Sequence, residues 1–180
     1  MNEKDILALI AGDSWRMGVL RRAEKLQLPQ WAIGAGFVRN IVWDHLHHYT
    51  NATPPTDIDL IYFDPSDSHR DRDQKLAEQL KSETGCEWEI VNEARAYEWN
   101  HLPPYTSMED VLLRWPETAT GIAVRLVSDE VQLIAPNGID DLVNLIVRPC
   151  PLFPEGLAGV EKRMAKKQWL KKWPLLKLAK

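Results

Sequence analysis

The chain has 180 residues and a mass of 20.7 kDa, and 44% of its residues are hydrophobic and 27% charged. These values fit one folded domain and exclude a fibrous or intrinsically disordered chain. Its apolar runs fall short of the ~20 residues that a membrane helix needs, and its first residues do not resemble a signal peptide. Cys86 and Cys150 have no metal-binding or redox spacing, which indicates reduced thiols in a cytoplasmic protein.

Charge is distributed unevenly along the chain. Residues 1–160 hold 14 basic and 25 acidic residues, a net charge of −11, whereas residues 161–180 hold eight basic residues and one acid. Because nucleic acids are bound by basic surfaces, the acidic body is not expected to bind them. Only the basic C-terminal helix could do so, and a packed helix with a solvated basic face is the simpler interpretation.

Hydrophobic periodicity predicts helices that alternate with strands. The expected helices cover residues 3–11, 14–27, 37–48, 71–83, 94–99, 107–115, 138–146 and 155–173. The expected strands cover residues 31–33, 57–63, 87–92, 122–127 and 131–134. Because strands interleave with helices, the fold class is α/β or α+β, with a small mixed sheet and flanking helices at both ends. A single domain is expected, with N-terminal helices over 1–28, a core over 29–135 and C-terminal helices with the basic tail over 136–180.

Two carboxylates lie on the strand predicted over residues 57–63. Asp57 and Asp59 are two residues apart, so both side chains project from the same face of the sheet. Neighbouring carboxylates repel each other, and a divalent cation between them relieves that repulsion. Hard oxygen ligands suit Mg²⁺ or Mn²⁺, which also accept phosphate oxygens as ligands. Taken alone, the pair fits two solvated carboxylates at a strand edge equally well.

A turn with two glycines precedes this pair. Gly34, Ala35 and Gly36 join the strand 31–33 to the helix 37–48, which leaves backbone N–H groups and the positive helix end available to an anion. The turn lacks the third glycine of a dinucleotide fingerprint and the Gly-Lys-Ser/Thr of a Walker A loop. An anion-binding turn followed by a metal-binding strand predicts a polyphosphate and its metal in one cleft.

The run Ala-Gly-Phe-Val-Arg-Asn over residues 35–40 resembles the Gly-Gly-x-Val-Arg-Asp motif of tRNA CCA-adding enzymes and poly(A) polymerases. With the D-x-D strand, it resembles the nucleotidyltransferase superfold of DNA polymerase β type. Over nearly its full length, the chain is similar to a family of small bacterial nucleotidyltransferase-like proteins of unknown activity, through segments 88–95, 135–142 and 148–151.

The resemblance implies metal-dependent transfer of a nucleotidyl group from an NTP to a hydroxyl acceptor. It implies that Asp57 and Asp59 hold Mg²⁺ or Mn²⁺ with the triphosphate, and that Glu89 is a third ligand that helps to deprotonate the acceptor. These three acids are thus the expected catalytic and metal-binding residues. The expected nucleotide-binding residues are Gly34, Ala35, Gly36, Arg39, Asn92 and Arg95.

Several basic and polar residues have alternative interpretations. Arg39 lies one turn into its helix, where it reaches a phosphate or forms a salt bridge on the helix surface. Asn92 and Arg95 contact nucleotide or orient Glu89, and a packing role fits Asn92 equally well. Arg125 is expected to pair with a carboxylate or to face the cleft. The histidines at 45, 47 and 48 indicate a solvated helix end rather than a metal site.

Two departures from the family motif leave the acceptor unassigned among small molecules, RNA and protein. If Arg39 is aligned with the motif, Ala35 replaces its first glycine; alternatively, Gly34 and Ala35 replace Gly-Gly or Gly-Ser, and a hydroxyl donor is lost. An extra loop over residues 47–55 also separates the glycine turn from the carboxylates. Two other function classes remain: a non-catalytic nucleotide-binding or regulatory module, and an RNA-binding partner protein that uses the basic tail. The intact set of three carboxylates favours the enzyme.

Overall fold

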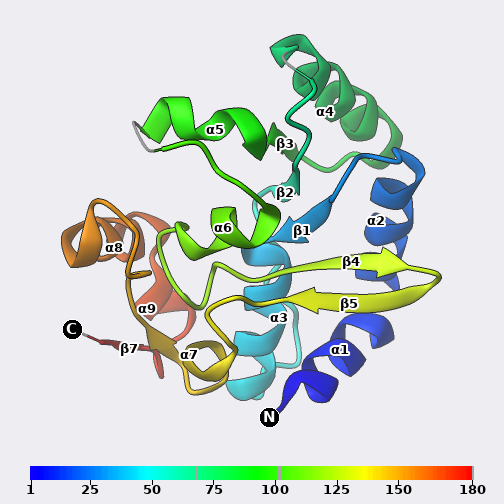
Figure 1. Ribbon diagram of the computed structural model, residues 1–180. Helices are drawn as coiled ribbons and strands as arrows, with labels where there is room; N and C mark the ends of the chain where they lie inside the picture. Colours follow the sequence, from blue (N-terminus) through cyan, green and yellow to red (C-terminus); the bar gives the residue numbers. More distant parts are fainter. Residues whose placement is uncertain (68, 101–102, 180) are drawn as a thin grey trace.

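The computed structural model describes residues 1–67, 69–100 and 103–179 (Figure 1). Its described part contains a mixed sheet with the strand order β3-β2-β1-β4-β5. Strands β2 and β3 are parallel, and the other neighbouring pairs are antiparallel. These strands are β1 (Ala32–Gly34), β2 (Ile58–Tyr62), β3 (Trp88–Asn92), β4 (Ala123–Val127) and β5 (Glu130–Ile134). The predicted small mixed sheet is therefore confirmed.

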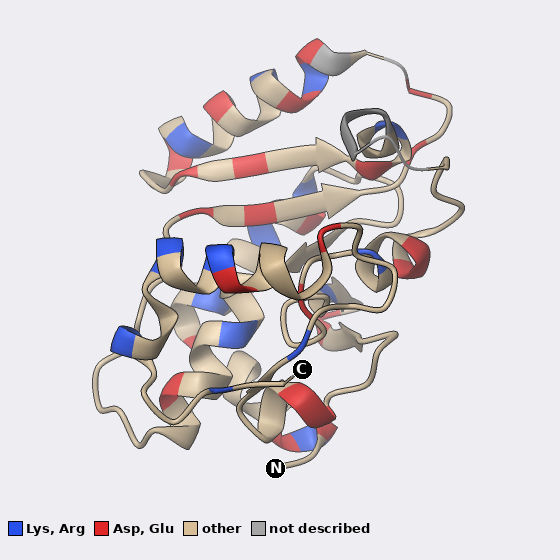
Figure 2. Cartoon of the chain, turned by 90° about the vertical axis from the view of Figure 1, so that its left-hand side faces the viewer, with Lys and Arg blue, Asp and Glu red and all other residues tan. Residues whose placement is uncertain are grey.

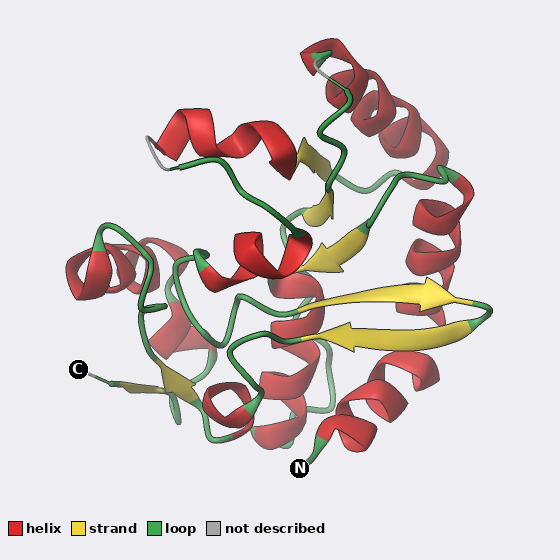
Figure 3. Ribbon diagram, in the orientation of Figure 1, coloured by secondary structure: helices red, strands yellow, loops and turns green. Residues whose placement is uncertain are grey.

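Helices cover both faces of this sheet (Figure 3). In chain order they are α1 (Glu3–Gly12), α2 (Ser14–Lys25), α3 (Gly36–Leu46), α4 (Arg70–Thr84), α5 (Glu93–Asn100), α6 (Met108–Leu113), α7 (Asp140–Val143), α8 (Gly156–Lys167) and α9 (Trp169–Lys172). The larger core joins one face of the sheet to helices α1 to α4. A smaller core joins the opposite face to α5 and α6. Side chains alternate between these two cores along each strand, as the pleat requires.

Local signals in the sequence account for several helix ends. The Asp13 carboxylate accepts a hydrogen bond from the Arg16 N–H at 3.0 Å and so caps the start of α2. The Ser107 hydroxyl accepts one from the Asp110 N–H at 3.2 Å and caps α6 in the same way. Gly85 ends α4 with a φ of 70°, a left-handed conformation that glycine adopts without steric cost.

The C-terminal third differs most from the predicted elements. The helix expected over 138–146 is reduced to α7, and Leu145, with a φ of 59°, leads instead into strand β6 (Ile146–Val147). This strand pairs in parallel with β7 (Lys177–Leu178). The helix expected over 155–173 is divided at Gln168, whose φ is 53°. A left-handed residue cannot continue a right-handed helix, so both expected helices end early.

The basic C-terminal segment is docked against α3. The ring centroid of Trp43 lies 5.5 Å from that of Trp169 and 5.1 Å from that of Trp173, both in edge-on geometry. The Trp173 indole N–H donates to the Asp44 carboxylate at 2.7 Å. Figure 1 accordingly shows α9 beside α3. The segment is therefore a part of the folded unit rather than a projecting tail.

The same contact uses one of the three histidines at the end of α3. The His47 Nε2 atom accepts a hydrogen bond from the Leu175 N–H at 3.1 Å, and its Nδ1 atom lies 2.7 Å from the Trp43 carbonyl. Both ring nitrogens of His47 are thus occupied within the fold.

No helix in the described part of the chain has the length and apolarity needed to cross a membrane.

Candidate active site

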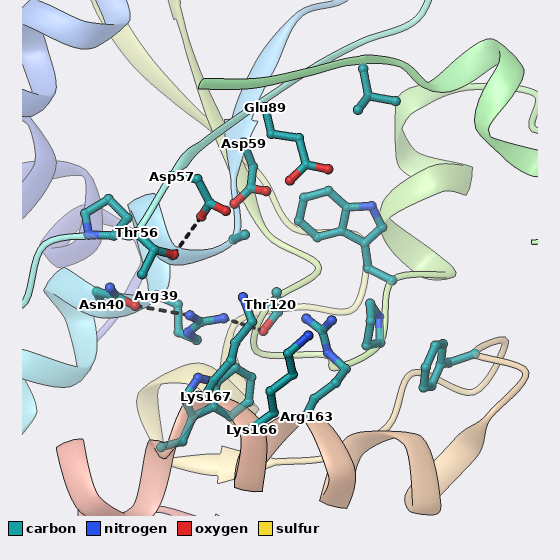
Figure 4. A pocket seen from close by; sticks show the side chains of 18 of the residues that line it. Arg39, Asn40, Thr56, Asp57, Asp59, Glu89, Thr120, Arg163, Lys166 and Lys167 are labelled. Carbon is teal, nitrogen blue, oxygen red and sulfur yellow. Dashed lines mark hydrogen bonds between the residues drawn. The ribbon is translucent and has the colours of Figure 1, made fainter. Parts of the chain in front are cut away.

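Three carboxylates meet on the face of the sheet that bears the smaller core. Asp59 on β2 is the register partner of Glu89 on β3, and Asp57 directly precedes β2. One oxygen from each of the three acids lies within 4.8 Å of the others, and Figure 4 shows them pointing into one pocket. The structure thus brings together the three acids that the sequence predicted to converge, and the cluster could bind a metal ion.

Electrostatic strain is concentrated at Asp59. Burial, together with the neighbouring charges of Asp57 and Glu89, raises the pKa of its carboxyl group to about 7, while Lys167 and Arg39 oppose the rise. Within the described residues, none of the three acids forms an ion pair. An all-oxygen cluster of like charges without a contacting cation is suited to a hard divalent ion.

A fourth carboxylate, which the sequence analysis did not identify, lies behind this cluster. Glu93 begins α5 one residue after β3, is only 7% exposed and lines the same pocket. Burial, together with the charges of Glu89 and Asp59, raises the pKa of its carboxyl group to about 8, while a hydrogen bond from Trp115 opposes the rise. Its position four residues after Glu89, at the turn from strand to helix, is the sequence signal that could have revealed it.

The glycine turn forms the wall next to the carboxylates. Ala35 and Gly36 line the pocket, and Ala35 caps α3 with its backbone at a φ of 51°. Gly34 has a different use, because a Cβ atom there would lie 2.8 Å from the ring of Trp115. Two residues of the predicted nucleotide-binding turn therefore face the pocket, while Gly34 permits close packing behind it.

The pocket has a volume of about 720 Å³ and three chemically distinct walls. One wall holds the carboxylates and the glycine turn. A second wall is cationic and consists of Arg163, Lys166, Lys167 and Lys172. Figure 4 shows the first three of these side chains directed towards the acids. The third is aromatic and includes Tyr105, Trp115 and Phe153. This size and mixture of surfaces suit a small charged molecule with an apolar part.

Arg39 lies at the base of the pocket and is only 5% exposed. Its guanidinium donates to the Thr120 hydroxyl at 3.0 Å and to the Asn40 side-chain oxygen at 3.2 Å, and stacks 4.4 Å from the ring centroid of Trp169. Burial lowers its pKa to about 10. The alternative of a salt bridge on the helix surface is not observed, because Arg39 is buried and, within the described residues, has no carboxylate within 4 Å.

Asn92 and Arg95 lie elsewhere, between β3 and the loop that precedes α4. The Asn92 side chain, which is 0% exposed, donates to the Asp64 carbonyl at 2.8 Å and accepts from the Asp64 N–H at 3.0 Å. Arg95 donates to the Asp73 carboxylate at 2.6 Å and to the Asp67 carbonyl at 2.7 Å. Neither belongs to the described lining of the pocket. These contacts agree with the packing alternative for Asn92, and they give Arg95 a structural role as well.

Arg125 takes neither of its two expected positions. Its guanidinium lies 3.3 Å from the side-chain oxygen of Gln132, its register partner on β5. It is not among the described residues that line the pocket. A cross-strand hydrogen bond on an exposed hairpin explains this arginine without a carboxylate partner.

The mixed sheet, the glycine turn and the carboxylates on adjacent strands together define the class of nucleotidyltransferases. A nucleotidyltransferase family model matches residues 21–178, and the chain belongs to that family. The resemblance inferred from the sequence is therefore confirmed. A search of curated proteins gives no match.

Solved structures with the same fold include CCA-adding enzymes. An NMR structure described as revealing a CCA-adding enzyme head domain has a TM-score of 0.86 and 30% identity, with 99% of this chain and 96% of that chain covered. The Thermotoga maritima CCA-adding enzyme complexed with tRNA has a TM-score of 0.59, 16% identity, and coverage of 100% and 43%. A CCA-adding enzyme with CTP has a TM-score of 0.60 and 15% identity, with 100% of this chain and 44% of that chain covered. The chain spans less than half the length of these two enzymes, and the likeness to them shows the fold.

Proposed function

We propose that this protein is a metal-dependent nucleotidyltransferase that moves a nucleotidyl group from an NTP to an acceptor hydroxyl. The observation that carries the proposal is the cluster of Asp57, Asp59 and Glu89, whose oxygens lie within 4.8 Å of one another. Like charges held this close destabilise a protein unless they bind a cation. The pocket that contains them is also lined by the glycine turn and by a cationic wall, and a helix N-terminus and basic side chains are surfaces that suit a metal-bound triphosphate.

The donor set fits Mg²⁺ or Mn²⁺, because all three side chains offer hard carboxylate oxygens. Asp57 and Asp59 would hold the ion on β2, and Glu89 would add a ligand from β3. A bound ion of this kind neutralises phosphate charge and polarises the phosphoryl group. In the part of the chain that the structure describes, no cation forms an ion pair with these acids, so their oxygens are available as ligands.

Different residues of the pocket would bind the phosphates and accept the proton during the transfer. The glycine turn, through Ala35 and Gly36, holds the phosphates, and Arg39 supplies positive charge at the base of the pocket. Glu89 is exposed at the pocket, where an acceptor from solvent can reach it, and it accepts the proton of the acceptor hydroxyl. The acceptor oxygen then forms a bond to the α-phosphorus, the bond from that phosphorus to the bridging β-oxygen breaks, and pyrophosphate leaves.

The donor is better supported than the acceptor. Structures of CCA-adding enzymes of the same fold have been solved with CTP and with tRNA, which makes an NTP the natural donor here. The aromatic wall beyond Glu89 offers a surface on which a planar acceptor group could stack. A small molecule, an RNA or a protein remains the acceptor class to be identified.

Transfer of label identifies the acceptor and tests the proposal. The protein would be incubated with each NTP labelled at the α-phosphate, Mg²⁺ and a cell extract, with Asp59→Asn as the matched control. We expect a labelled product with the wild type and none with Asp59→Asn or with EDTA. Mg²⁺-dependent NTP binding without any labelled product would instead identify a non-catalytic nucleotide-binding module.

A further inference from the structure

The cationic wall of the pocket comes from the segment that looked like a basic tail in the sequence. On α8, Lys166 and Lys167 follow Arg163 by three and four residues, so all three share one face of the helix. All three line the pocket, and Figure 4 shows them across it from Asp57 and Asp59. Figure 2 shows α8, with its blue basic segments, lying beside the strands that carry red acidic segments.

This wall is held in place by contacts on both sides of the basic residues. Arg163 donates to the Glu117 carboxylate at 2.7 Å, and Glu117 is 0% exposed. Directly after Lys167, Trp169 and Trp173 pack on Trp43 of α3. The basic face is therefore positioned before any ligand binds, which reduces the entropy that binding must overcome.

The two lysines face the acids without contacting them. Within the described residues, neither Lys166 nor Lys167 takes part in an ion pair or a side-chain hydrogen bond. Lys167 is nevertheless near enough for its charge to act on Asp59. The pocket between the two walls thus has room for a ligand that presents cations to the acids and anions to the lysines.

A metal-bound triphosphate has this distribution of charge. We propose that Arg163, Lys166 and Lys167 bind the β- and γ-phosphates of the nucleotide, so that the basic C-terminal segment is a phosphate-binding wall and not an RNA-binding tail. This inference rests on the proposed function and adds to it the residues that hold the leaving group. The lysines and arginine offset the negative charge that accumulates on pyrophosphate as its bond to the α-phosphorus breaks.

Two lysines on α8 and α9 that lie outside the pocket provide a matched control. Lys162 on α8 and Lys171 on α9 are exposed and are absent from the described lining of the pocket. The double variant Lys162→Gln/Lys171→Gln therefore removes as much charge as Lys166→Gln/Lys167→Gln, but from outside the pocket. Arg163 is left intact in both, because removing it would leave the buried Glu117 carboxylate without its cation.

Calorimetric titration with two probes tests the inference: ATP and inorganic tripolyphosphate, each in excess Mg²⁺. For Lys166→Gln/Lys167→Gln we expect about a tenfold or greater loss of affinity for both probes. The control variant should stay within about twofold, and Lys166→Arg/Lys167→Arg should restore most of the loss. Thermal melts without ligand should show that every variant is folded, with only a small shift of the midpoint, because the substituted side chains are exposed.

Each other outcome overturns a stated part of the account. If wild type binds both probes and the two double variants bind them equally well, the phosphate-binding wall is wrong and the proposed function stands. If Lys166→Gln/Lys167→Gln loses affinity for a transfer RNA probe but keeps it for tripolyphosphate, the wall serves a nucleic acid. If wild type binds neither probe in Mg²⁺, the proposed function itself fails.

Discussion

Two polar clusters lie along the same pair of parallel strands, and they differ in whether a cation pairs with their carboxylates. At the end where β2 begins, Asp57, Asp59 and Glu89 approach one another with no cation in contact among the described residues. At the end where β3 finishes, the Asp73 carboxylate is fully engaged by Arg95 and by the Asn92 N–H. Paired polar groups stabilise a fold, whereas unpaired like charges destabilise it and are characteristic of binding and catalytic sites.

The paired cluster shows how a polar group is buried at low cost. Asp73 accepts from the Arg95 guanidinium at 2.6 Å, from the Asn92 N–H at 3.1 Å and from the Tyr62 hydroxyl at 2.6 Å. Burial and the hydrogen bond to Asp73 raise the pKa of Tyr62. The cluster ties β2, β3 and α4 together, and it leaves little capacity for a ligand.

The largest expected effect comes from the unpaired cluster. Asp59→Asn removes an anionic ligand from the centre of the three acids, so affinity for Mn²⁺ should fall by roughly a thousandfold. Titration of Mn²⁺ followed by electron paramagnetic resonance measures the loss directly and needs no knowledge of the acceptor. Glu109→Gln, in the first turn of α6, is the control and should bind Mn²⁺ like the wild type. Unchanged Mn²⁺ affinity in Asp59→Asn would mean that the acids are not a metal site.

Breaking the paired cluster should have the opposite pattern. Arg95→Ala leaves the Asp73 carboxylate largely buried without its cation, so the free energy of unfolding should fall by about 2–3 kcal/mol. Affinity for Mn²⁺ should not change, because Arg95 lies outside the described pocket lining. Urea unfolding and the same Mn²⁺ titration test both points. Normal stability with weakened NTP binding would instead make Arg95 a nucleotide-binding residue.

A smaller effect is expected from Glu93 through pH. Its folded-state pKa of about 8 lies above the ordinary value of 4.5, so the unfolded chain releases this proton at lower pH than the folded protein does. The contribution of Glu93 to the free energy of unfolding is therefore fully present below pH 4.5, and it is lost progressively as pH rises towards 8. In EDTA, Glu93→Gln should remove part of this loss and gain about 1–2 kcal/mol at pH 8 relative to the wild type. Parallel pH profiles for the two proteins would exclude this contribution.

The smallest effect should come from the glycine turn. Ala35 holds a φ of 51°, a conformation that costs alanine energy and glycine little. Ala35→Gly should therefore raise the free energy of unfolding by about 0.5–1 kcal/mol. Urea denaturation at constant pH measures the change, with Ala158→Gly inside α8 as a control that should destabilise. A destabilised Ala35→Gly would show that the turn is not strained.

Much of the site could be predicted from the sequence because its signals are local. Asp57 and Asp59 share a face through the period of one strand, whereas Glu89 was added by the resemblance to the nucleotidyltransferase superfold. The glycine turn lies within one short segment. Patterns of this kind can be recognised without knowledge of distant contacts, so the sheet and the pair of aspartates follow from the residues themselves, and the resemblance supplies the third acid.

The remainder depended on contacts between distant parts of the chain. The burial of Arg39 requires Trp169, which lies 130 residues later and stacks on its guanidinium. The bonds of Asn92 and Arg95 go to the loop before α4, which no period in the sequence reveals. The basic segment looked like a solvated helix because its own spacing does not show the pocket it faces. Tertiary packing, rather than local propensity, decides such positions.

The central claim is that the three acids are kept for a metal-bound nucleotide at a cost in stability. Thermal melts of wild type and Asp59→Asn, without ligand, with Mg²⁺ and each NTP, and with NTP and EDTA, test it most directly. Without ligand, Asp59→Asn should be as stable as wild type or more stable by about 0.5–2 kcal/mol. A Mg²⁺-dependent NTP should stabilise wild type, and this shift should shrink in Asp59→Asn and disappear in EDTA. A clearly destabilised Asp59→Asn that keeps the full shift would contradict the claim and make the cluster structural.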